Sequence, residues 1–196
     1  MTGLAAGPDT RLAALISGWF APRSWMLVTA PLIGWHAAGP PGALWGALTA
    51  LVTGVVPPLL IEAGCRRGSW GGGLTERRDR LAAAPWILAP VAAGAVLLPL
   101  LGAPREMTAL VVAMAAVLLA LAAITTVWKV SAHSAVAAGA SAVLILGYGS
   151  WMLPLTVVTA ATAWSRIRLG RHTPAQVVVG VTVGAAAAGT TFSLLR

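Results

Sequence analysis

Residues 165–176 read SRIRLGRHTPAQ and separate two strongly apolar segments of the chain. Thr173, Pro174 and Gln176 fit the N-cap, N1 and N3 positions of a capping box, so a helix is predicted to begin here. His172 then lies just before a helix N-terminus, where free amides and the helix dipole favour an anion. With three arginines in the same stretch, these residues form a candidate phosphate site. The alternative is that the arginines only mark the cytoplasmic end of a membrane span.

The composition is that of an integral membrane protein. Of the 196 residues, 58% are hydrophobic and 9% are charged, whereas a soluble domain carries about 25% charged residues. A span normally needs about 20 residues. Spans are predicted at residues 24–38, 43–63, 86–102, 107–128, 134–148, 150–164 and 174–194, of which several are short. We therefore expect an all-α membrane bundle of six or seven spans, built as a single domain over residues 1–196.

The chain before the first span is predicted to lie on the membrane surface. Residues 1–23 form this N-terminal interfacial segment, and residues 10–23 within it suit a short amphipathic helix. Its lipid-facing side chains would be Leu12, Leu15, Ile16, Trp19 and Phe20. The net charge of +8 comes from basic residues beside the spans, so it indicates membrane topology, and no nucleic-acid partner is expected.

All five acidic residues precede Met107. Magnesium and calcium sites usually need several carboxylates, which the C-terminal half cannot supply. The single cysteine, Cys65, provides neither an internal disulfide nor a metal cluster. Chemistry near His172 is therefore predicted to need no metal and no cofactor.

Two further polar stretches are candidates for the same site. Residues 128–134 contain Ser131 as a possible N-cap and His133 in the first turn of the following helix. A lone histidine in an apolar protein is more often a packed core residue, but the neighbouring Lys129 and Ser131 favour a functional role. Residues 76–80, ERRDR, are by themselves most simply a cytoplasmic loop with local ion pairs. His36 has no polar neighbours and is interpreted as structural or interfacial.

The parity of the predicted spans brings these stretches together. Two spans separate residues 64–85 from residues 129–133, and two more separate these from residues 165–172, so all three meet at one membrane face. This face would carry Arg11, Arg23, Arg66, Arg67, Arg77, Arg78, Arg80, Lys129, Arg166, Arg168 and Arg171, and the other Arg105 and Arg196. Without the four candidate phosphate ligands Arg77, Arg80, Lys129 and Arg166, seven basic residues remain on the face with the site and two on the opposite face. Since positive loops stay cytoplasmic, the site of this multi-pass cell-membrane protein is predicted to face the cytoplasm.

Residues 165–176 resemble a motif of the type-2 phosphatidic acid phosphatase superfamily, which includes the vanadium haloperoxidases. That motif, Ser-Arg-x5-His-x3-Asp, matches Ser165, Arg166 and His172, with Gln176 in place of the aspartate. The glutamine can orient an imidazole through a hydrogen bond but supplies no charge.

The other two motifs of the family are less complete. Pro-Ser-Gly-His survives as Ser131 and His133, with both the proline and the glycine replaced. Lys-x6-Arg-Pro places Arg77 at the lysine position, but Ala84 stands where the arginine is expected. The resemblance covers residues 74–185 and implies a helical core like that of the phosphatase superfamily.

The resemblance also implies roles for these side chains. His172 would attack phosphorus and form a phosphohistidine, while His133 would act as general acid and then as general base. Arg166 would stabilise the charge that develops on the phosphoryl oxygens. The candidates for binding the substrate are Arg77, Arg80, Lys129, Ser131, Ser165 and Gln176.

We therefore expect metal-independent hydrolysis of a lipid phosphate or isoprenoid diphosphate. Two alternatives stay open because Ala84 removes a phosphate ligand and Gln176 lacks the aspartate's charge. One is a prenyl diphosphate lyase or terpene cyclase built on the same site, and the other is a catalytically silent lipid-binding protein. The expected partners are the substrate and the bilayer, and the sequence leaves the oligomeric state open.

Overall fold

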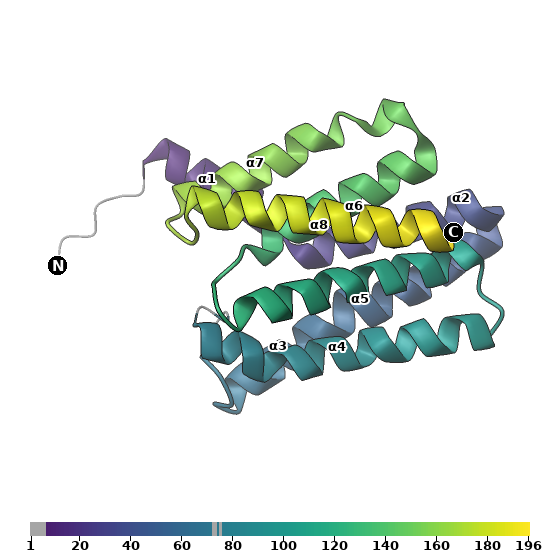
Figure 1. Ribbon diagram of the computed structural model, residues 1–196, viewed down its shortest axis with the longest axis horizontal. Coiled ribbons are helices and arrows are strands. Elements are labelled where there is room, and N and C mark those ends of the chain that lie inside the picture. The colour runs from purple at the N-terminus through teal and green to yellow at the C-terminus, as the bar shows by residue number, and fades with distance from the viewer. Residues whose placement is uncertain (1–6, 72–73, 75) are drawn as a thin grey trace.

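The computed structural model describes residues 7–71, 74 and 76–196. Within these ranges every regular element is a helix, which confirms the predicted all-α class. The elements are α1 (Pro8–Trp19), α2 (Pro22–Ala50), the π-helix η1 (Leu51–Val55), α3 (Val56–Arg66), α4 (Arg77–Leu100), α5 (Arg105–Thr125), α6 (Ala132–Tyr148), the 3₁₀-helix η3 (Ser150–Met152), α7 (Leu155–Arg168) and α8 (Pro174–Leu195). Most of them run lengthwise through the molecule, and the chain reverses direction at its two ends (Figure 1).

Four helical segments are long and apolar enough to cross a membrane. They are Pro22–Arg66, Arg77–Leu100, Arg105–Thr125 and Pro174–Leu195, with mean hydropathies between 1.7 and 2.7 in their most apolar windows. Large apolar side chains such as Leu44 and Leu100 remain 74% and 76% exposed, as surfaces that face lipid tails require. These properties fit a chain that crosses the membrane several times. The other two predicted spans correspond to α6, with 17 residues, and α7, with 14.

The longest of these segments folds back on itself. Ala38 and Gly39 leave the helical conformation, and Gly39 takes a φ of 60°, which glycine adopts without steric cost. A Cβ on either Gly34 or Gly42 would overlap the other's carbonyl oxygen, so the two arms touch backbone to backbone. The arms correspond to the two predicted spans at residues 24–38 and 43–63.

α6 and α8 pack just as closely at the centre of the bundle. A Cβ on Gly184 would overlap the carbonyl oxygen of Ala135, and one on Gly180 would lie 2.7 Å from that of Ser131. The backbone amide of Ser131 also donates to the carbonyl oxygen of Gln176, at 3.2 Å. These contacts fix the first turns of α6 and α8 side by side.

Two helices near these first turns extend beyond the predicted spans. α4 begins at Arg77 instead of residue 86, because Arg, Leu and Ala at residues 77–84 favour helix despite their charge. α7 continues to Arg168 instead of residue 164, and arginines in a last helical turn interact favourably with the helix dipole. The charged residues therefore lie on helices that extend beyond the apolar segments.

The predicted interfacial segment is mostly helical where it is described. Residues 1–6 of it lie outside the described residues, and α1 covers Pro8–Trp19. Leu12, Leu15 and Trp19 are more than half exposed, whereas Ala13 and Ser17 are buried on the opposite side of the helix.

The polar stretches gather at one end of the bundle. The beginnings of α4, α6 and α8 and the end of α7 all lie at the left in Figure 1, together with α1. The C-terminus lies at the opposite end of the molecule. This arrangement is the one that the even number of predicted crossings requires.

The close packing of α6 on α8 is tested by adding one methyl group. Gly184→Ala forces a Cβ into the carbonyl of Ala135, so we expect a loss of about 1–3 kcal/mol and a lower midpoint of thermal unfolding in detergent. Gly189 is the matched control on the same helix, since its added Cβ meets that of Ala142 at an ordinary 3.7 Å. Gly189→Ala should unfold no earlier than wild type, and equal midpoints for the two variants would contradict this packing.

Candidate active site

A cavity of about 390 Å³ opens at the end of the bundle where the polar stretches meet. Four candidate residues from three separate parts of the sequence line it: Arg80 on α4, His133 on α6, Arg166 on α7 and His172 in the loop before α8. The structure therefore brings both predicted catalytic histidines and the predicted catalytic arginine to one cavity.

The rest of the cavity wall is mainly apolar. Met26, Ile61, Leu88, Met114, Leu118 and Val136 are among the side chains that line it. They come from α2, α3, α4, α5 and α6, so the apolar part extends into the bundle away from the histidines. An amphiphile with an anionic head and a hydrocarbon chain matches this division.

A capping box holds His172 in place. Thr173 caps α8 by accepting from the amide of Gln176, and the Gln176 side chain reaches back to the amide of Thr173, as the sequence predicted. In that contact Gln176 Oε1 accepts the Thr173 N–H at 3.3 Å. The same oxygen lies 3.0 Å from His172 Nδ1. Because a carbonyl oxygen only accepts, Nδ1 carries the proton and Nε2 keeps its lone pair.

The surroundings keep this imidazole neutral. His172 is 7% exposed, and burial lowers its pKa to about 4, assisted by Arg80, Lys129 and Arg166 and opposed by its hydrogen bond to Gln176. A group with this pKa is uncharged at pH 7. Its Nε2 is thus available as a nucleophile.

Arg166 makes hydrogen bonds to α1 and to the loop before α8. Its NH1 donates to the hydroxyl of Ser17 on α1 at 2.6 Å, while its Nε is buried without a hydrogen-bond partner among the described residues. Its carbonyl oxygen accepts from the amides of Arg171 and His172 at 3.1 and 3.3 Å, where Gly170 takes a φ of 63°. This turn connects Arg166 and His172 through the backbone.

Arg80 is a second arginine at the cavity, besides Arg166. It lies one helical turn before Ala84 on α4, and both residues line the cavity. Its Nε donates to the carbonyl of Leu74 and its NH1 to that of Val130, each at 2.9 Å. These bonds join the start of α4 to the segment before α6 and direct a second guanidinium toward the histidines.

The remaining candidates lie near the cavity without lining it. Arg77 donates to the carbonyl oxygen of Thr126 at 2.9 Å, and the hydroxyl of Ser165 donates to the backbone carbonyl oxygen of Thr162 at 2.7 Å. Ser131 caps α6 as predicted, with its hydroxyl oxygen accepting from the amide of Ser134. Their side chains therefore hold the backbone around the site.

Lys129 adds to the positive potential of this end of the molecule. Partial burial lowers its pKa, and so do the charges of Arg80, Arg166 and Arg171. In the described part of the chain, no group of three or more His, Cys, Asp or Glu side chains converges as a metal site would require. The charge of this cluster suits an anionic ligand.

Two residues at the site were missed by the sequence analysis. Ser17 holds the Arg166 guanidinium, and its only sequence signal is its spacing of four from Ala13 on the buried stripe of α1. Arg23 lines the cavity, but it was interpreted only as a topology marker. Both lie in the N-terminal segment, outside the range covered by the family resemblance.

Comparison of the chain with protein-family models, with curated proteins and with solved structures found no match.

The neutral state of His172 gives a direct prediction. In detergent-solubilised protein we expect it to titrate with a pKa of about 4 instead of 6.5, seen by ¹⁵N NMR of ring-labelled histidines and assigned with His172→Asn. Because the folded-state pKa is lower, its contribution to the unfolding free energy is present above pH 6.5 and decreases as the pH falls through about 4. A proton on Nε2, or a pKa near 6.5, would contradict the geometry described above.

Proposed function

We propose that this protein is a metal-independent phosphatase that hydrolyses a lipid phosphate or an isoprenoid diphosphate through a phosphohistidine. The observation that carries the proposal is one cavity lined by two histidines and three arginines and elsewhere mainly by apolar side chains. The partial match to the phosphatase motifs at Ser165, Arg166 and His172 supports the same reaction.

In the first step, His172 Nε2 attacks phosphorus. The bound anionic substrate first favours uptake of a proton by His133 from solvent. The new N–P bond then forms as the P–O bond to the leaving group breaks, and the protonated His133 gives this proton to the departing oxygen. In the second step, His133 takes a proton from water, whose oxygen attacks the same phosphorus. Phosphate leaves, and Nε2 regains its lone pair.

The cations stabilise the charge that develops on the phosphoryl oxygens. Arg166 and Arg80 line the cavity from opposite parts of the sequence, and each is already held by hydrogen bonds to protein oxygens. Such pre-positioned donors need little rearrangement during the reaction. Lys129 contributes through its charge at longer range.

Because Gln176 carries no negative charge, we expect the enzyme to be slow. Once His172 is phosphorylated its ring is positively charged, and Gln176 stabilises that charge only through the Nδ1–H hydrogen bond. Replacing the aspartate of a serine-protease triad by its amide costs about 10⁴ in rate. That example combines the loss of charge with a wrong tautomer, whereas here the capping box keeps the correct tautomer.

The lyase or cyclase alternative ranks second. Such a reaction releases a carbocation, which proteins shelter with the faces of aromatic rings. The described residues that line this cavity include no Trp, Tyr or Phe. The silent lipid-binding protein ranks third. Binding alone does not require the free lone pair on His172 Nε2, whereas nucleophilic attack does.

The proposed topology is a multi-pass cell-membrane protein of six or seven spans with a phosphatase-like helical core over residues 74–185. α6 and α7 count as short spans packed within the bundle. The excess of basic residues at the site end supports a cytoplasm-facing site, which would give access to isoprenoid diphosphates made in the cytosol.

Product analysis tests the reaction. Purified protein incubated with farnesyl diphosphate and a chelator should release inorganic phosphate and farnesyl monophosphate or alcohol. His172→Ala should reduce this to background, while His36→Ala, which removes the histidine beside Tyr148 at the other end of the bundle, should retain wild-type turnover. Hydrocarbon with free diphosphate would favour the lyase or cyclase, and unchanged substrate would favour the binding protein.

The same assay in oriented membranes tests the topology. Inside-out vesicles should release phosphate from added farnesyl diphosphate, and sealed right-side-out vesicles should do so only after permeabilisation. Immediate turnover in right-side-out vesicles would reverse the orientation and favour lipids exposed on the outer face.

A further inference from the structure

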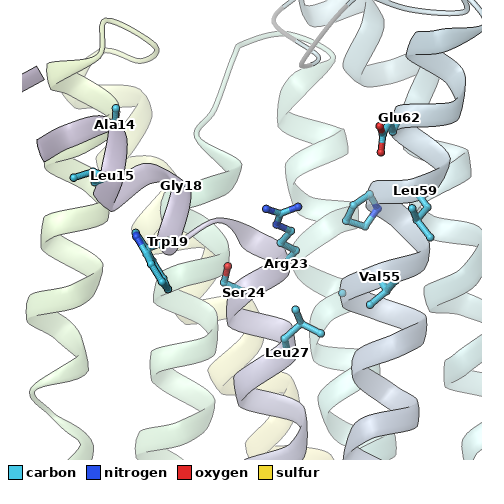
Figure 2. A pocket seen from close by; sticks show the side chains of 12 residues that line it. Ala14, Leu15, Gly18, Trp19, Arg23, Ser24, Leu27, Val55, Leu59 and Glu62 are labelled. Atoms are coloured by element: carbon cyan, nitrogen blue, oxygen red, sulfur yellow. The ribbon is translucent and has the colours of Figure 1, made fainter. Parts of the chain in front are cut away.

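A second hollow of about 700 Å³ lies beside the cavity, on the outer surface of the bundle. It is a groove between α1 with the start of α2 on one side and η1 with α3 on the other. Figure 2 shows Arg23 near its centre, with Leu15 and Trp19 on one side and Val55, Leu59 and Glu62 on the other.

The groove and the cavity are neighbours that share part of their walls. Arg23 and Pro58 line both hollows, so they lie between them. On the groove side the adjacent residues are Gly54 and Leu59, and on the cavity side they include Thr53 and Ile61. The route from the surface groove to the histidines therefore passes these two residues.

The helix is interrupted at the same place. Residues 51–55 form a π-helix, and Pro57 and Pro58 follow it. Neither proline has an N–H, so the carbonyl of Thr53 lacks both the donor of an α-turn and that of a π-turn. An element with a weakened hydrogen-bond ladder bends more easily, which suits a passage that must widen.

The chemistry of the groove matches an amphiphile. Leu15, Trp19 and Leu59 are 60%, 74% and 57% exposed, so its rim is apolar and open to the surroundings. Glu62 is paired with Arg66 at 2.6 Å, whereas Arg23 makes no ion pair or side-chain hydrogen bond within the described ranges. The charge left at the junction with the cavity is thus positive.

We propose that this groove is the lateral entrance through which a membrane-dissolved lipid phosphate or diphosphate reaches the cavity. The hydrocarbon chain slides between α1 and α3, and Arg23 receives the anionic head before Arg166 and Arg80 do. This inference rests on the proposed function for the nature of the substrate. It adds that the substrate comes from the bilayer and that the α1–α3 gap admits it.

Filling the groove tests the route. Gly18 lines it, and a Cβ added there meets no atom within 4 Å, so Gly18→Phe occupies open space. We expect this variant to raise KM about tenfold for geranylgeranyl diphosphate in phosphatidylcholine vesicles, with kcat unchanged. Turnover of isopentenyl diphosphate, a short water-soluble probe, should stay at the wild-type rate because it needs no lateral route.

Gly7 provides the matched control. It is the N-cap residue of the same helix, outside the groove, and an added Cβ there is equally unobstructed. Gly7→Phe should leave both substrates unaffected. Equal KM values for Gly18→Phe and Gly7→Phe, or an equal loss of both substrates in Gly18→Phe, would overturn the entrance.

A binding measurement separates the entrance from the reaction. His172→Ala protein in vesicles is irradiated with a benzophenone-tagged geranylgeranyl diphosphate, and the labelled peptides are identified by mass spectrometry. Label within residues 14–27 and 54–62 that is displaced by untagged geranylgeranyl diphosphate is expected. Such labelling without any phosphatase activity in wild type would overturn the reaction and keep the entrance, whereas label confined to other segments would overturn the entrance.

Discussion

The site depends on the backbone contact between α6 and α8. Because Gly180 and Gly184 carry no side chains, the two helices approach until the carbonyls of Ser131 and Ala135 fill the space of the missing Cβ atoms. This contact and the Ser131–Gln176 backbone hydrogen bond set the two helix starts side by side. His133 and His172 stand at those starts. Small residues at this helix interface thus position the two histidines as well as allow the helices to pack closely.

The second constraint is the concentration of positive charge at a cavity whose described lining includes no carboxylate. Arg80, Lys129, Arg166 and Arg171 repel one another, and the protein offsets this by directing Arg80 and Arg166 to carbonyl and hydroxyl oxygens. Each arginine is ordered before a ligand arrives and still carries its full charge. An anion in the cavity would relieve the repulsion between these cations. Because Arg80 and Arg166 are held by neutral oxygens and not by carboxylates, their charge favours binding of a phosphate.

The sequence predicted the features that depend on local rules. The Thr173–Gln176 capping box and the Ser131 cap are confirmed, because capping depends on residues three apart. Hydropathy located the helices but not the start of α4 at Arg77, since charged residues are compatible with a helix that projects beyond the membrane. The choice of Arg80 over Arg77 as a cavity residue, and the contact of Ser17 with Arg166, depend on how helices rotate and pack across more than a hundred residues of chain. The pattern of neighbouring residues in the sequence does not determine how the helices rotate and pack.

The central claim is that the neutral Nε2 of His172 is the nucleophile. The most direct test mixes the protein with farnesyl diphosphate that carries ³²P on its terminal phosphorus and stops the reaction rapidly with alkali. Acid is avoided because phosphohistidine survives alkali. The labelled peptide is then identified by mass spectrometry. The account predicts a transient phosphoprotein whose phosphate is on the peptide containing His172, absent in His172→Ala. Phosphate release at the wild-type rate with no phosphoprotein, or with the label on another residue, would contradict it.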